Sequence, residues 1–231
     1  MAEILRLLQI DVWAAVPAAS GPLGVDAISV IAGRRSETPE HLWSSGGIAD
    51  AFEDLQLMLG EGPGPDSLAF GTAVRVHDLA RVRADRWPAL LTEASDLSVQ
   101  AVFCFPLRLG AITLGVLTLL RKVPGPLTVT QGDDASVAAA LTKRILNLDF
   151  PLLGASEEPD PPHHHAVLHQ ATGMVSVQLS VSLAEALLRL RAHAYSNSLN
   201  LTDTARDIVE RRLRLAPETL PAIAVDDADE D

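Results

Sequence analysis

The sequence is poor in cysteine. Cys104 is the only one among 231 residues, so no disulfide can form within the chain. Reduced thiols are typical of the cytoplasm, and we expect this protein to work there. Cys104 lies in the apolar run VFCFP with no basic neighbour in sequence that would lower its pKa. A buried, inert thiol is therefore predicted rather than a redox sensor.

Long hydrophobic runs are also missing. No apolar stretch reaches the roughly 18 to 20 residues that cross a bilayer. The N-terminal residues include acids and lack the basic region of a signal peptide, and we read Ala2–Ala15 as an amphipathic helix. The glycine-rich segment 60–66, GEGPGPD, lacks the Lys-Ser/Thr pair of a phosphate-binding loop and is expected to be a turn at a pocket rim. No nucleophile elbow occurs. The sequence thus predicts no catalytic residues, no cofactor and no membrane association.

Positive charge is scarce overall but unevenly distributed. The formal net charge is −12, which argues against nucleic-acid binding through bulk attraction. Segment 163–215, however, holds six arginines against four acids and carries five of the seven histidines. The tail 216–231 contributes six acids. One part of an acidic protein is therefore mildly basic, a contrast that the whole-chain charge hides.

A change of composition divides the chain. Residues 154–165, GASEEPDPPHHH, have glycine, prolines and acids but no apolar period, which indicates a linker. We predict a mixed α/β domain over 1–150, a linker over 151–163, a three-helix module over 164–215 and a disordered acidic tail over 216–231. Metal binding by His163-His164-His165 is one reading of the linker end, but these residues have no acid or cysteine partner at ligand spacing. We favour a solvated loop and predict no metal site.

The first domain shows short strands separated by helices. A two-stranded hairpin is predicted over 101–121, where two apolar runs flank Leu109–Ala111, and its strands are expected to be buried on both faces or central in the sheet. Gly60 is expected to end the helix predicted over Ile48–Leu59. The other expected strands are Val25–Ala32, His41–Ser45 and Val74–Val76, and the other expected helices are Ile48–Leu59, one turn at Ser67–Phe70, Trp87–Ala94 and Thr130–Leu148.

This order resembles a GAF domain, an antiparallel sheet with helices against it and a ligand pocket on one face. The resemblance rests on EGPGPD after a helix, on Trp87-Pro88, and on FPLRLGAITLGVLTLLR with Gly115 in its second strand. It implies an α+β sensor that accepts a small molecule of unspecified identity. Gly64 stands where related sensors often have a cysteine, which argues against thiol sensing in that loop.

The second part predicts three short helices. Ser182 and Glu185 form a capping box, and a stripe of apolar residues follows at i, i+3, i+4, i+7 and i+11. Asn200 is the expected N-cap of the last helix. The stripe consists of Leu183, Ala186, Leu187, Leu190 and Ala194. A helix of this length is marginal alone, so the three must pack on one another.

Arg191 and Tyr195 are four residues apart and are expected on one flank of the second helix. A guanidinium can clamp phosphate or a base edge, and an aromatic ring can stack on an unpaired base, so the pair suits loop RNA. Arg211, Arg212 and Arg214 add charge at the end of the third helix. The alternative is purely structural: Arg191 bridges within the bundle, Tyr195 packs, and the terminal arginines favour the helix dipole.

The module closely resembles the ANTAR domain, an RNA-binding antitermination module of bacterial regulators. The matching residues are ATGM at 171–174, Glu185-Ala186 through Leu190-Arg191, Ala194-Tyr195 and LTDTA at 201–205. The resemblance implies a homodimer in which each module binds one of two paired stem-loops in a nascent transcript and prevents a terminator hairpin from forming. Thr172 and Leu187 depart from the family, which often has a basic and an aromatic residue there; both could face RNA in those members.

The sequence therefore predicts a signal-responsive RNA-binding regulator that acts in transcription antitermination. Ala2–Ala15 and Thr130–Leu148 are the expected dimer helices. One alternative is a protein-interaction or dimerisation sensor without nucleic acid, which the acidic net charge favours. Another is an enzyme built on the sensor pocket, which the absence of an acid/base pair or nucleophile disfavours.

Overall fold

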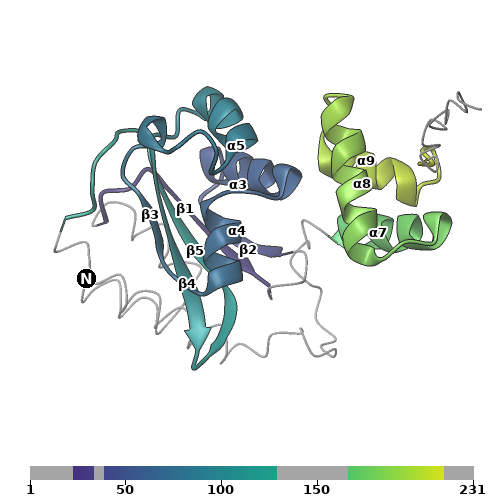
Figure 1. The fold of residues 1–231 in the computed structure, drawn as a ribbon, viewed down its shortest axis with the longest axis horizontal. Helices are drawn as coiled ribbons and strands as arrows, with labels where there is room; N and C mark the ends of the chain where they lie inside the picture. The colour runs from purple at the N-terminus through teal and green to yellow at the C-terminus, as the bar shows by residue number, and fades with distance from the viewer. Residues whose placement is uncertain (1–22, 34–38, 129–165, 216–231) are drawn as a thin grey trace, which may run out of the picture.

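An antiparallel sheet organises the first part of the computed structural model, which describes residues 23–33, 39–128 and 166–215. The strand order is β2-β1-β5-β4-β3, so β5 lies at the centre (Figure 1). The bounds are β1 Ala27–Ala32, β2 Glu40–Ser44, β3 Val74–Val76, β4 Ala101–Leu109 and β5 Ile112–Arg121. The predicted hairpin is confirmed as β4–β5, joined through Gly110 in the left-handed region at φ 59°. Its strands are central, as expected from their continuous apolar runs.

The close contact between β1 and β5 explains why residue 115 is a glycine. Gly115 pairs with Ala32, and a Cβ at this position would lie 2.1 Å from the carbonyl oxygen of Ile31. Only glycine allows the two strands to approach in this way. Strand β1 is buried along its whole length, and β4 and β5 are mostly buried away from the hairpin turn that joins them.

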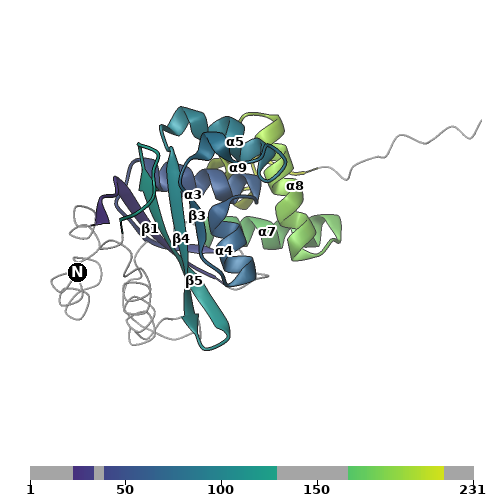
Figure 2. The same ribbon diagram turned by 60° about the vertical axis from the view of Figure 1, so that its left-hand side comes forward.

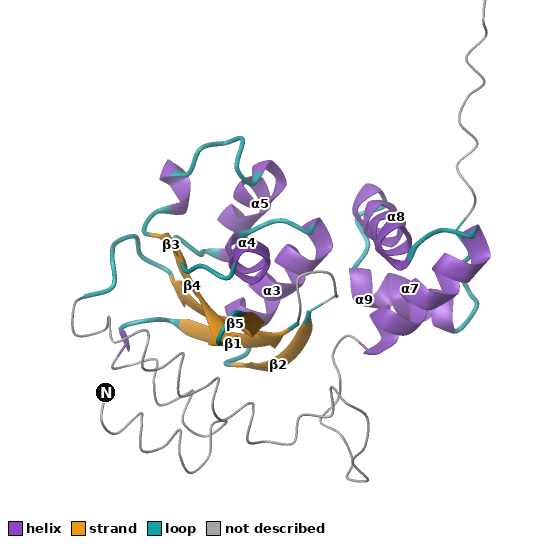
Figure 3. Ribbon diagram, turned by 60° about the horizontal axis from the view of Figure 1, so that its bottom comes forward, coloured by secondary structure: helices purple, strands orange, loops and turns teal. Residues whose placement is uncertain are grey.

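The described helices of this part lie on one face of the sheet (Figure 3). They are α3 Ile48–Leu59, α4 Pro63–Phe70 and α5 Pro88–Glu93, with short 3-10 turns at Leu79–Arg81 and Ala94–Leu97. Phe52 and Trp87 fill the space between helices and sheet, together with Val102 and Leu120 from the strands. The expected α+β class is therefore confirmed by strand pairing and helix placement.

Two local expectations need correction. Segment 60–66 is not only a turn, because α4 begins at Pro63 and runs through the residues expected to form a single turn. Proline is well placed at the first helical position, where its missing N–H has no helical partner to lose. The first strand begins at Ala27 rather than Val25. Gly60 does end α3, in the left-handed conformation at φ 69°.

Three helices form the second part: α7 Ala166–Leu179, α8 Leu183–Ser196 and α9 Leu201–Val209. Ser182 Oγ accepts from the backbone N–H of Glu185 at 3.2 Å, and Asn200 Oδ1 accepts from two backbone N–H groups at the start of α9. Both predicted N-caps are confirmed. The Glu185 carboxylate does not close a capping box but pairs with Arg189 at 2.7 Å.

Alanine and leucine side chains share the core between these helices. Ala171, Ala186, Ala194 and Ala205 are fully buried, as are Leu168 and Leu190. Leu183, a predicted member of the stripe, is instead 61% exposed. It is the first residue of α8 and lies beyond the end of the shared core.

The three-helix unit rests against α3 of the first part, and Figures 1 and 2 both show it beside that helix. Leu57 of α3 is buried in the core of the three-helix unit. At the edge of the contact, His169 lies 3.8 Å from Glu40. The two parts therefore share a packed joint.

Several predictions fall outside the described residues. They concern helices Ala2–Ala15 and Thr130–Leu148, the linker, the His163-His164-His165 run and the acidic tail. Within the described ranges, no single helix combines the length and apolar character that membrane crossing needs. Helices α7 and α8 meet those criteria only as a pair, with a bend of 105° between them.

Candidate nucleic-acid interface

Helix α8 carries the two strongest predicted RNA contacts, Arg191 and Tyr195. Both side chains leave the helix on the flank that faces the first part, as their spacing requires. Tyr195 is 53% exposed and available to a partner. Arg191 is largely buried at the joint and lines a cavity of the first part. The structure thus places Tyr195 at the surface, whereas Arg191 is largely buried between the two parts.

Arg191 lies over Gly60, at the end of α3. A Cβ on Gly60 would come within 2.8 Å of the Nη1 atom of Arg191, so the absence of a side chain makes room for the guanidinium. The Nε atom is buried and has no hydrogen-bond partner among the described residues. Burial lowers the pKa of the Arg191 guanidinium below its ordinary value. The sequence did not predict this contact between Arg191 and Gly60, because Gly60 was interpreted only as the residue that ends the helix.

The arginines after α9 differ from one another. Arg212 pairs with Asp207 at 2.6 Å and with Glu210, so acids of its own segment compensate its charge. Arg211 and Arg214 are exposed and form no ion pair with other described residues. They border a groove of about 890 Å³ whose floor includes Gly173 and Met174 of α7. Among the described residues, therefore, no acid neutralises the two arginines beside this groove.

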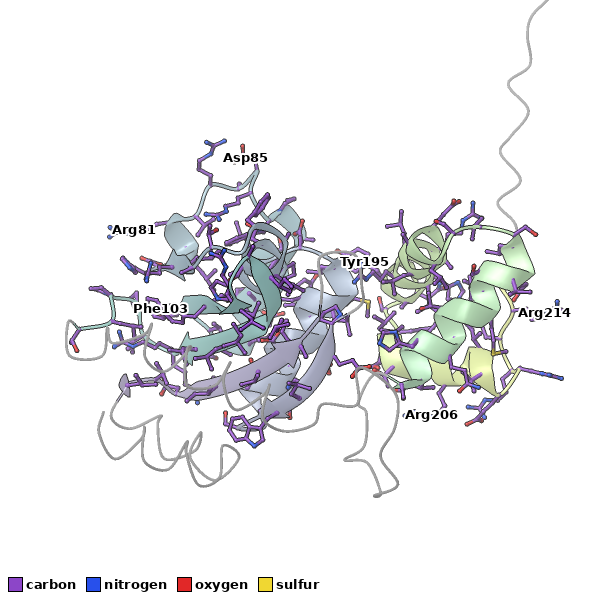
Figure 4. All side chains as sticks on the ribbon, turned by 90° about the horizontal axis from the view of Figure 1, so that it is seen from below. Arg81, Asp85, Phe103, Tyr195, Arg206 and Arg214 are labelled. Carbon is purple, nitrogen blue, oxygen red and sulfur yellow. The ribbon has the colours of Figure 1, made fainter. Side chains whose placement is uncertain are left out.

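The five predicted contacts do not form one patch. Figure 4 shows Tyr195 on the side of the module that faces the first part, and Arg214 on the opposite side. Arg191 lies with Tyr195, and Arg211 and Arg214 share the groove. The module consequently offers two surfaces, one at the joint and one away from it.

Thr172 does not face a ligand. It is 6% exposed, and its hydroxyl donates to the carbonyl of Leu168 at 2.7 Å. Leu187 is partly buried against the module core. At both positions this chain uses the residue for packing, so neither can supply the RNA contact that a basic or aromatic residue could make.

A cavity of about 260 Å³ lies between the sheet, α3, α4 and Arg191. Glu53 lines this cavity and is buried, and its carboxylate accepts from Ser29 Oγ at 2.5 Å and from Gln56 Nε2 at 3.0 Å. Desolvation raises the pKa of the Glu53 carboxyl, against those hydrogen bonds. The backbone N–H of Gly64 donates to Gln56 Oε1, which fixes the rim. The sequence placed Glu53 on an amphipathic helix but gave no signal that it is buried.

Cys104 lies in the core of the sheet rather than at the cavity. It is fully buried beside Thr118, and burial raises the pKa of its thiol well above the ordinary value. The thiolate that reacts with oxidants is therefore disfavoured. The prediction of a buried thiol is confirmed.

No protein-family model matches the chain, and no curated protein matches it. Solved structures similar to it include the GAF domain of an Acinetobacter phosphoenolpyruvate-protein phosphotransferase, at 13% identity over 68% of this chain and 95% of that one, with a TM-score of 0.48. A GAF domain from a phosphoenolpyruvate-protein phosphotransferase of Coxiella burnetii is 15% identical over 63% and 92% of the two chains, with a TM-score of 0.48. A type II free methionine-R-sulfoxide reductase from Thermoplasma acidophilum is 10% identical over 62% and 96%, with a TM-score of 0.43. These similarities concern the fold and carry nothing about activity or ligand.

Proposed function

We propose that this protein is a signal-responsive RNA-binding regulator that acts by transcription antitermination. The observation that carries the proposal is the exposure of Tyr195, Arg211 and Arg214 on a small helical module of an otherwise acidic chain. An exposed aromatic ring stacks on unpaired bases, and free guanidinium groups bind phosphate. The match to ANTAR sequence motifs across the same module supports this reading. The GAF-like first part would sense the signal.

The position of Arg191 suggests how the two parts communicate. We call the arrangement in which the module packs against α3 the docked form. In this form the guanidinium of Arg191 cannot contact RNA, because Gly60 and the cavity wall cover it. An RNA contact by Arg191 requires α8 to move away from α3. The docked form is accordingly the form with weaker RNA affinity, and a signal acts by shifting the population of docked and undocked forms.

Dimerisation fits the weak charge of a single module. Segment 163–215 has six arginines and four acids, so one module alone should bind one stem-loop weakly. Two modules on one transcript gain affinity through effective concentration. We therefore propose a homodimer with one module on each of two stem-loops.

The test is binding of the purified full chain to an RNA with two stem-loops, measured by fluorescence anisotropy at two salt concentrations. Tyr195→Ala should weaken binding by roughly fivefold to a hundredfold, the range of stacking on one base. Arg189→Ala is the matched control, because Glu185 already pairs with that arginine. An RNA with scrambled loops should bind less well. Equal affinity for both RNAs, or no effect of Tyr195→Ala, would count against RNA readout.

A second candidate function is a protein-interaction platform. Val177, Leu183 and Leu188 are 83%, 61% and 64% exposed on the module, which is apolar surface that a protein partner could cover. Under this reading Val177→Asp and Leu188→Asp abolish self-association or partner binding, while no loop-specific RNA binding is found. The anisotropy experiment separates the two functions.

A further inference from the structure

Arg191 has no anionic partner in the part of the chain that the structure describes. Three other arginines of the module pair with acids, Arg189 with Glu185, Arg206 with Asp203 and Arg212 with Asp207, while Arg211 and Arg214 are exposed to solvent. Arg191 forms no such pair with a described residue, although it is the most desolvated of them and its Nε is buried without a partner. A buried charge that lacks a partner costs free energy, which a bound anion would recover.

The cavity in front of Arg191 has apolar walls. Ile31 of β1, Leu57 of α3 and Leu68 of α4 line it, and its volume is about 260 Å³. Sites for drug-sized ligands measure roughly 300–1,000 Å³, so the occupant is smaller. An apolar body of a few carbons fits these walls, because burying it removes apolar surface from water.

The charge around the cavity limits the occupant to one negative group. Glu53 lines the cavity, and its carboxyl is already held by Ser29 and Gln56. A second anionic group near Glu53 would lose its hydration in the same desolvated place that raises the pKa of the Glu53 carboxyl. At Arg191, the fork of a guanidinium matches the planar geometry of a carboxylate.

We propose that this cavity binds a small monocarboxylate, whose carboxylate pairs with Arg191 while its apolar body packs on Ile31, Leu57 and Leu68. The walls come from the first part and the charge from α8. Filling the cavity therefore favours the docked form over the undocked one. The consequence for RNA rests on the proposed function, since the ligand would hold Arg191 away from RNA; the binding itself does not rest on it.

The test uses straight-chain alkanoates from propanoate to octanoate with the full-length protein, followed by ligand-observed NMR. Affinity should rise about fourfold per methylene, the value of one buried CH2, until the cavity is full. The corresponding n-alkanols, which lack the charge, should bind at least tenfold more weakly. Equal affinity of acids and alcohols, or no binding of any alkanoate at tens of millimolar, overturns the proposal.

Two variants locate the site. Arg191→Gln should abolish the preference for acids over alcohols, whereas Arg189→Gln, a change of the same kind on the same helix, should preserve it. Ala69→Phe narrows the cavity without touching the charge, because Ala69 lines it and is only half-buried. It should shorten the chain length of greatest affinity. An unchanged acid preference in Arg191→Gln, or an unchanged optimum in Ala69→Phe, overturns the assignment.

A last measurement distinguishes the failure of alkanoate binding from the failure of the proposed RNA binding. The alkanoate of highest affinity is added to the RNA titration, where it should raise the dissociation constant for RNA severalfold in the native chain but not in Ala69→Phe. If the native chain binds no RNA at all, the proposed function fails while the NMR result still decides the ligand site. If RNA binds and the bound alkanoate leaves its affinity unchanged, the coupling to docking is overturned.

Discussion

The first part of this molecule and the three-helix module have different kinds of hydrophobic core. The first part buries large side chains, among them Trp87 and Phe52, between a sheet and its helices. The module buries alanines at the points where its helices meet, including Ala171, Ala186 and Ala194. Aromatic side chains each bury a large apolar area, whereas an alanine buries little but allows helices to approach closely.

This difference teaches which part depends on the other. The module completes its core with Leu57, a residue of α3, while the core of the first part contains no module residue among those described. A short three-helix unit whose described core residues include four alanines and no aromatic residue has little apolar area with which to offset its conformational entropy. Docking to the first part therefore stabilises the module, and undocking has a cost that a signal or RNA must offset.

The largest effect should come from the aromatic core. Phe52→Ala is expected to lower the free energy of unfolding by about 3–5 kcal/mol, through lost burial and the remaining cavity. Urea denaturation followed by circular dichroism measures it. Phe70→Ala is the control, because Phe70 is 69% exposed and its loss should cost under about 0.5 kcal/mol. Similar losses in both variants would contradict the contrast between the cores.

At the buried alanines of the module, adding side-chain volume rather than removing it should destabilise the fold. Ala194 is fully buried between the helices, so Ala194→Leu should force α8 away from its neighbours and cost about 1–3 kcal/mol. Thermal unfolding of the native chain and the variant gives the difference. Ala192→Leu, on the exposed side of the same helix, should be nearly neutral. If the core of the module were loosely packed, the two variants would behave alike.

A buried carboxyl should make the stability of the first part depend on pH. The pKa of Glu53 is raised above 4.5, so the folded state holds its proton more tightly than the unfolded chain does. Stability from this group is full below the unfolded value and declines as pH rises through the folded value, by up to about 1.4 kcal/mol per pH unit. Urea midpoints measured from pH 4.5 upward should show this decline. Glu53→Gln should flatten it, and an identical slope in the variant would show that another group is responsible.

The smallest effect concerns the caps of the module. Asn200→Ala removes the acceptor of two backbone N–H groups at the start of α9 and should cost about 1 kcal/mol. Asn200→Asp keeps an acceptor and should retain most of the stability. Hydrogen exchange of the α9 amides reports the change locally. Equal protection in both variants would mean that packing alone fixes the start of this helix.

Local patterns in the sequence predicted the parts of the structure that local forces determine. Helix α3, strand β3, the β4–β5 hairpin and the caps at Ser182 and Asn200 depend on periodicity and on hydrogen bonds between near neighbours. Helix α4 was predicted only as one turn at Ser67–Phe70, because the glycines and prolines before it were interpreted as turn residues. Its first turn begins at Pro63, where a helix tolerates proline.

What the sequence could not predict depends on residues far apart in the chain. Arg191 is buried because Gly60 lies under it, and neither residue alone signals the contact. The buried carboxyl of Glu53 is held by the hydroxyl of Ser29, which belongs to β1 and lies 24 residues earlier in the chain. The assignment of Arg191, Tyr195, Arg211, Arg212 and Arg214 to RNA binding stays a prediction, for which the structure supplies geometry.

The single, inaccessible thiol of Cys104 makes this protein convenient for labelling. Because the thiol is fully buried and its pKa is raised, maleimide dyes should leave it unmodified in the folded chain. A cysteine introduced at an exposed position on α8 and another on the outer face of α5 would then be the sole labelled sites. Fluorescence energy transfer between two such dyes could follow the distance across the joint in real time, without first removing a native cysteine.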